Sequence, residues 1–112
     1  MGREAVSALS NAIKYGTQSQ KTFLIEKGVL DCFISLLVST DKRMLKDVLE
    51  GILDFLRARN VLTSDKYENL LEKYLKDKGA VDKIRELEHD EDEEVSRIAK
   101  EIIKIRENFS FL

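Results

Sequence analysis

The sequence of 112 residues contains no proline and no tryptophan, only five glycines and a single cysteine. Because proline is absent and glycine is rare, few residues interrupt helices, which favours helical structure throughout. One cysteine cannot form an internal disulfide bond, which is typical of a reducing compartment. Cys32 lies in an apolar run, so we expect a buried, inert thiol rather than a reactive one.

A basic excess is also missing, because 19 Lys and Arg stand against 21 Asp and Glu, giving a net charge of -2. This balance disfavours nucleic acid as a partner. No apolar run approaches the length of about 18 residues that a membrane-spanning helix needs, and the N-terminus lacks the apolar core of a signal peptide. We therefore expect an intracellular chain that binds neither nucleic acid nor membrane.

The convergent groups of an enzyme are missing as well. The only histidine, His89, lies between Glu88 and Asp90, a position typical of a solvent-exposed loop histidine rather than of a general base. No metal-ligand spacing, glycine-rich phosphate loop or nucleophile motif is present. We expect no catalytic residue, no metal and no cofactor.

The sequence does contain a series of amphipathic segments, separated by glycine or by capping residues. In residues 3–15, apolar side chains recur at the spacing of one buried helical face, and Gly16 follows. Thr17 and Gln20 have the spacing of a capping box, in which each side chain satisfies a free backbone N–H group. The predicted helices are 3–15, 17–27, 29–38, 42–58, 65–78, 80–88 and 91–107, with 59–64 as a connector.

The chain also repeats itself at two offsets. At an offset of 43, the apolar face of residues 3–15 falls on apolar residues between 48 and 56. At an offset of 51, residues 23–28 (FLIEKG) fall on residues 74–79 (YLKDKG). A unit of short helix, glycine, short helix and long helix at this period is typical of armadillo and HEAT repeats.

We therefore predict an all-α, right-handed armadillo-type solenoid of about seven helices. Residues 3–15 would be the third helix of a truncated repeat, 17–58 a first complete repeat and 65–107 a final capping repeat. Because the truncated repeat lacks two helices, we expect Val6, Leu9 and Ile13 to be partly uncovered. The isolated chain should then self-associate or be only marginally stable.

Two polar stripes on the long helices are candidates for a peptide-binding site. Residues at i, i+3 and i+7 share one helical face, and the two stripes are related by the offset of 43. The stripe residues are Glu4, Ser7 and Asn11 in the first helix and Asp47, Glu50 and Asp54 in the fourth. In a solenoid such stripes lie side by side in a concave groove, where carboxylates can bind Lys and Arg side chains. The alternative is the ordinary polar face of an amphipathic helix, and the spacing alone leaves both open.

An acidic run lies between residues 86 and 94, where seven of nine side chains are carboxylates. One interpretation is a solvated turn whose acids lie favourably at the N-terminus of the last helix. The other is a docking patch for a basic partner. The run contains no aromatic anchor, which favours the first interpretation.

Several motifs resemble importin α, the armadillo-repeat adaptor of nuclear import. Residues 3–11 (REAVSALSN) resemble the family's groove-helix signature Lys-Glu-Ala-Ala-Trp-x-x-Ser/Thr-Asn, and residues 16–20 (GTQSQ) continue with its Gly-Thr-x-x-Gln. Residues 79–84 (GAVDKI), followed by Leu87 and His89, are similar to the Gly-Gly-Leu-Asp-Lys-Ile motif of the family's final repeat. The resemblance implies that the chain corresponds to the family's C-terminal portion, from the third helix of the eighth repeat through the tenth.

For function, the resemblance implies binding of Lys- and Arg-rich nuclear localisation signal peptides at the edge of the family's minor site. Asn11 would hold the peptide backbone, and Glu4 would favour a basic side chain. Ser7 stands where the family has the Trp that packs against a signal lysine, so this stacking contact is absent. The second stripe likewise does not repeat the family's pair of Trp and Asn.

The resemblance also implies a second partner, the export receptor with the GTP-bound form of Ran, at residues 67–112. Importin β would bind through a region that this sequence does not contain, and the protein would shuttle between nucleus and cytoplasm. The alternative is a stand-alone armadillo-like helical scaffold for protein–protein interaction without a transport role.

Overall fold

The amphipathic segments form helices close to the predicted positions. The computed structural model describes residues 2–58, 65–77 and 79–110, so the connector that we predict at 59–64 lies outside the described residues. The helices are α1 (Arg3–Tyr15), α2 (Gln18–Glu26), α3 (Val29–Ser35), the 3₁₀ helix η1 (Leu36–Val38), α4 (Lys42–Ala58), α5 (Asp65–Asp77), α6 (Ala80–Leu87) and α7 (Glu93–Ser110). The prediction of an all-α protein is confirmed for the part of the chain that the structure describes.

Local capping signals determine several helix ends. The backbone N–H of Thr17 donates to Gln20 Oε1 at 2.8 Å, and the N–H of Gln20 donates to Thr17 Oγ1 at 3.2 Å, so the predicted capping box is present at the start of α2. Gly28, before α3, and Gly79, before α6, have φ angles of +88° and +65°. A side chain would be strained in this left-handed conformation, which explains glycine at both joints.

The predicted bounds of two helices are wrong by more than one residue. The last helix begins at Glu93 rather than at 91, because the Asp92 carboxylate caps it by accepting from the N–H groups of Glu94 (2.9 Å) and Val95 (3.3 Å). It ends at Ser110 rather than at 107. The predicted helix 29–38 ends as an α-helix at Ser35 and continues as η1. Hydrogen bonds between residues three apart satisfy carbonyl groups at this helix end; for example, the Ser39 N–H group donates to the Leu36 carbonyl at 3.0 Å.

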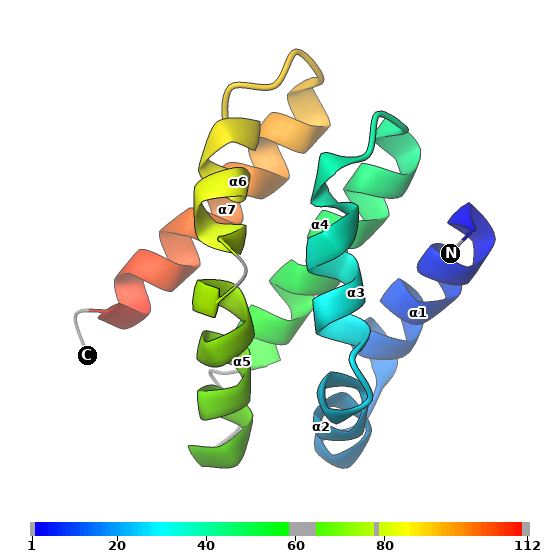
Figure 1. Ribbon diagram of the computed structural model, residues 1–112, viewed down its shortest axis with the longest axis vertical. Coiled ribbons are helices and arrows are strands. Elements are labelled where there is room, and N and C mark those ends of the chain that lie inside the picture. Colours follow the sequence, from blue (N-terminus) through cyan, green and yellow to red (C-terminus); the bar gives the residue numbers. More distant parts are fainter. Residues whose placement is uncertain (1, 59–64, 78, 111–112) are drawn as a thin grey trace.

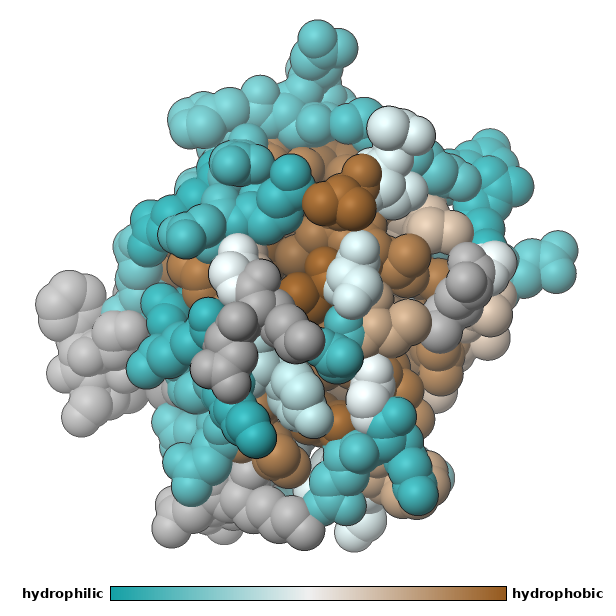
Figure 2. All heavy atoms as spheres, viewed as in Figure 1, coloured by the Kyte–Doolittle hydropathy of each residue, from teal (hydrophilic) through white to brown (hydrophobic). Residues whose placement is uncertain are grey.

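The helices form two layers (Figure 1). In one layer α4 lies between α1 and α7 and contacts both, and in the other α3 and η1 pack on α4 while α6 packs on α7. Figure 2 shows hydrophobic side chains across the middle of the face that carries the second layer, framed by hydrophilic residues. The interface between the layers is aliphatic and aromatic, and α4 contributes its fully buried members Val48, Leu49, Ile52, Phe55 and Leu56.

The burial of the apolar face of α1 differs from the expectation. Val6 and Ile13 are completely buried rather than partly uncovered, because α1 turns them toward α4 and α2; only Leu9 is half-buried. The exposed apolar side chains at this end are instead Tyr15 (78% exposed) and Phe23 (55% exposed), beside a hollow of about 350 Å³. Self-association stays a prediction, and Tyr15 and Phe23 are the residues that would carry it.

Cys32 is only partly buried, so the expectation of a buried thiol is met in part, and its inertness stays a prediction. Its neighbours Leu30, Phe33 and Ile34 occupy the core-facing side of the short helix α3, which leaves Cys32 at the edge of that side. His89 is exposed in the turn after α6, as predicted. Within the three described ranges, no helix is both long and apolar enough to cross a bilayer.

Candidate peptide-binding groove

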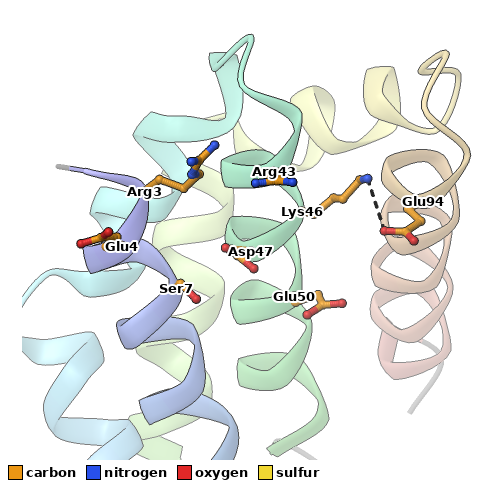
Figure 3. A pocket seen from close by; sticks show the side chains of 8 residues that line it. All are labelled: Arg3, Glu4, Ser7, Arg43, Lys46, Asp47, Glu50 and Glu94. Atoms are coloured by element: carbon orange, nitrogen blue, oxygen red, sulfur yellow. Dashed lines mark ion pairs between the residues drawn. The ribbon is translucent and has the colours of Figure 1, made fainter.

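The three long helices α1, α4 and α7 line an open groove of about 500 Å³, which we call the groove (Figure 3). Its walls carry charges of both signs. The lining residues are Arg3, Glu4 and Ser7 from α1, Arg43, Lys46, Asp47 and Glu50 from α4, and Glu94 from α7. A second, smaller hollow of about 110 Å³ shares Glu50 with the groove and continues along α4 to Asp54 and Arg57.

The structure brings most of the two predicted stripes together. Glu4, Ser7, Asp47 and Glu50 line the groove, with Glu4 at its outer edge on α1 and Ser7 facing the space between α1 and α4 (Figure 3). Asp54 lines the second hollow. Asn11, by contrast, is exposed and lines neither of these two hollows.

Three cations also line the groove and were not predicted as site residues: Arg3, Arg43 and Lys46. A signal for them was present. Arg43 precedes Asp47 by four residues and so lies on the same helical face, and Arg3 and Lys46 are related by the offset of 43 that relates the two stripes.

The long helices α4 and α7 begin with the same capping arrangement. Asp41 accepts from the N–H groups of Arg43 (3.0 Å) and Met44 (3.2 Å), as Asp92 does from the N–H groups of its own second and third following residues. Two residues earlier, Ser39 Oγ accepts from the Asp41 N–H at 3.1 Å, and Asp90 Oδ2 accepts from the Asp92 N–H at 3.0 Å. Ser39 and Asp90 are 51 residues apart, as are Asp41 and Asp92, so residues related by the sequence offset of 51 make the same hydrogen bonds.

Each cap also receives a cation from the preceding long helix. Arg3 on α1 lies 3.7 Å from the Asp41 carboxylate, and Lys46 on α4 lies 3.2 Å from the Asp92 carboxylate and 3.3 Å from that of Glu94. The cations are 43 residues apart and the caps 51 residues apart, the same two offsets that the sequence shows. Ion pairs at equivalent positions thus join the long helices twice at the edge of the groove, and the pair of Lys46 is the shorter one.

The acidic run takes part in these joints. Lys42 donates to Asp90 at 2.7 Å, and this hydrogen bond holds the pKa of the Asp90 carboxyl below its usual value. Desolvation raises the pKa of Asp92, but hydrogen bonds from Lys46 and from the N–H groups of Val95 and Glu94 outweigh it and lower that pKa. The hydrogen bond to Asp92 in turn raises the pKa of Lys46. Asp90, Asp92 and Glu94 therefore act within the fold, which favours the helix N-terminus interpretation over a docking patch for these three residues.

Four stripe carboxylates, in contrast, form no ion pair within the described part of the chain: Glu4, Asp47, Glu50 and Asp54. Burial raises the pKa of Asp47, and this effect outweighs the opposing charge of Arg3. Burial likewise raises the pKa of Asp54 despite the nearby cations Arg57, Lys14 and Lys21. These two carboxylates are thus partly desolvated without full compensation by the protein's own cations.

Asp54→Asn is expected to raise the melting temperature at pH 7 by about 2–4 °C. Because the folded-state pKa of Asp54 is raised, its ionised carboxylate lowers the free energy of unfolding at neutral pH. The destabilisation starts as the pH rises above the unfolded pKa of about 4 and is complete above the folded pKa. Thermal unfolding of both proteins at pH 3 and pH 7 measures the effect, and the difference should vanish at pH 3.

Glu50→Gln provides the matched control, because Glu50 lies one turn earlier on the same face and is exposed. It should change the melting temperature at pH 7 much less. A difference for Asp54→Asn that is equal at pH 3 and pH 7 would contradict the assignment to a desolvated charge.

No family model matches this chain. In the described ranges, no three His, Cys, Asp or Glu side chains come together as metal ligands would. The groove lining carries carboxylates, guanidinium groups and the Lys46 ammonium group, and each of these can bind a group of opposite charge.

Proposed function

We propose that the groove binds Lys- and Arg-rich peptide segments, and that the chain is the C-terminal armadillo segment of an importin-α-like nuclear import adaptor. The observation that carries this proposal is the row of carboxylates along α4 that form no ion pair with the described residues, of which Asp47 and Asp54 are partly desolvated.

The physical reason is that a partly desolvated carboxylate has lost part of its hydration and is stabilised when a cation binds to it. Lys and Arg side chains form short, charge-assisted hydrogen bonds with carboxylates, and these bonds are stronger where water is partly excluded. A basic peptide would supply the positive charge that Arg3, Arg57 and the neighbouring lysines supply only in part. Nuclear localisation signals are cargo of this chemical class.

The armadillo-type solenoid is part of the same proposal. Two features support it: α4 packs between α1 and α7, and the caps and cations at both junctions recur at the offsets of 51 and 43. A solenoid in which each unit contacts its neighbours along one axis has these properties.

The remaining partners rest on the resemblance of the sequence to importin α. The export receptor, together with GTP-bound Ran, would dock on residues 67–112, which include α6 and α7. The protein would then shuttle between nucleus and cytoplasm, and importin β would bind elsewhere in a longer adaptor.

A stand-alone helical scaffold is the second candidate. It is favoured by the exposed Tyr15 and Phe23 beside an apolar hollow, which offer a protein-binding surface away from the groove. In this case the carboxylates of α4 would be an ordinary polar face, and a basic peptide would not select them.

A two-dimensional amide NMR titration of the isolated chain with a Lys/Arg-rich localisation-signal peptide tests the proposal. We expect shift changes clustered at Glu4, Ser7 and the α4 stripe from Asp47 to Asp54. The titration detects millimolar contacts and reports their place. A folded sample whose groove resonances do not move would overturn peptide binding here and favour the scaffold.

A further inference from the structure

The charges in the groove are not mixed at random along α4. Arg43 lies in the first turn of the helix, Asp47 one turn later and Glu50 almost one further turn on. Arg3 reaches from α1 toward the same end of the groove as Arg43 (Figure 3). One end of the groove therefore carries two guanidinium groups, with Glu4 at its outer edge and Asp41 near Arg3, and the part that follows along α4 carries the carboxylates Asp47 and Glu50.

Arg3 and Arg43 differ from Lys46 in their ion pairs and in their exposure to solvent. Lys46 contacts both Asp92 and Glu94, and its side chain is only 27% exposed. Arg43 is exposed and forms no ion pair among the described residues. The contact of Arg3 with Asp41 is long, at 3.7 Å, and the two side chains are 51% and 40% exposed, so this pair contributes little. Arg43 and Arg3 can therefore turn to an anionic ligand.

Resting on the proposed function, we propose that the groove selects a basic peptide that also carries an anionic residue, foremost a phosphorylated serine, two positions from a Lys or Arg. Arginine binds phosphate and carboxylate through paired N–H donors, so Arg43 and Arg3 provide a fitting site for the anion. Asp47 then takes the basic side chain.

The spacing follows from the helix. Asp47 follows Arg43 by four positions along α4, which corresponds to a rise of about 6 Å along the helix axis. In an extended peptide, side chains two residues apart point to the same side and are separated by about 6.6 Å. A peptide lying along α4 thus presents an anion to Arg43 and a cation to Asp47 when one residue lies between them.

Fluorescence anisotropy with four labelled peptides tests this inference on the full chain. One Lys/Arg-rich peptide carries serine two positions from a basic residue, a second carries phosphoserine there, a third carries glutamate, and a fourth carries the phosphoserine six positions away. We expect the second peptide to bind about three- to tenfold more tightly than the first. The fourth should bind like the first, and a gain for the third would mean that the anionic charge rather than the phosphate is selected.

Arg43→Gln should abolish the gain from phosphoserine, so that this variant binds the serine and phosphoserine peptides with equal affinity. Arg85→Gln is the matched control, because Arg85 is exposed on α6, outside the groove, and its replacement changes the net charge equally. The inference is overturned if phosphoserine brings no gain, or if the gain survives in Arg43→Gln. Failure of the serine peptide itself to bind would instead overturn the proposed function.

Discussion

Replacing Asp47 and Glu50 together with lysine is expected to weaken the binding of a Lys/Arg-rich peptide by about thirtyfold or more, or about 2 kcal/mol. The double variant removes two carboxylates of the groove and places two repelling cations at the same positions. The fold should persist, because Glu50 is exposed and the charge of Asp47 is partly desolvated without full compensation. Anisotropy titrations at fixed ionic strength measure the loss, and circular dichroism verifies the helical content.

A matched variant separates the groove from the overall charge of the protein. Asp82 and Glu86 are exposed on α6, outside the groove, and their joint replacement with lysine raises the net charge by the same four units. This control should lose little affinity. An equal loss in both double variants would show that the peptide responds to net charge alone and would remove the α4 stripe from the site.

Gly51→Ala is expected to lower the free energy of unfolding by about 1–2 kcal/mol and the melting temperature by about 5–10 °C. Gly51 is buried where α4 crosses α3, and a Cβ atom there would overlap Cε2 of Phe33 and lie 2.9 Å from its Cδ2. The Phe33 ring is fully buried, so it cannot move away freely. Alanine improves helix propensity by about 1 kcal/mol, which offsets only part of the overpacking.

Two further variants identify the cause. Phe33→Leu combined with Gly51→Ala should be more stable than the sum of the single changes predicts, because the smaller side chain relieves the overlap. Ala8→Gly, at the exposed position of α1 that corresponds to Gly51 at the offset of 43, measures the propensity effect alone. Thermal unfolding of Gly51→Ala at or above the melting temperature of the unchanged protein would contradict the packing argument.

Helix ends were predictable because their causes are local. The capping box of Thr17 and Gln20 involves residues three apart, and the glycines at 28 and 79 stand where the backbone adopts a positive φ. The start of α7 was misplaced by two residues because the acidic run offered several adjacent capping residues, and only the structure shows that Asp92 is the one used.

Burial and pairing across helices were less predictable. The periodicity of α1 correctly identified Val6 and Ile13 as its apolar face, but it could not say that α4 and α2 cover this face completely. Lys46 meets Asp92 at a distance of 46 residues along the chain, a pairing that no local spacing indicates. The offset of 43 relates Arg3 to Lys46, and the offset of 51 relates Asp41 to Asp92, yet neither offset indicates that Arg3 meets Asp41 or that Lys46 meets Asp92.

The positions of the groove carboxylates were predictable only in part, less than the helix ends and more than the contacts between helices. The offset of 43 predicted that the stripes of α1 and α4 would be neighbours, and Glu4, Ser7, Asp47 and Glu50 do line one groove. Helical periodicity could not indicate that Asn11 lies outside it, nor that Arg43 adds a positive charge at one end. Which members of a polar face converge depends on how two helices cross, and that angle is set by core side chains rather than by the stripe itself.

The position of α4 between α1 and α7 has a consequence for motion. Each outer helix can fray at its ends while α4 remains covered by the other, but an opening of α4 removes the apolar support of both at once. We therefore expect the slowest-exchanging amide protons of the three helices to share one cooperative opening. A ligand held by α4 alone would slow hydrogen exchange in both outer helices, including the parts of α1 and α7 that it never touches.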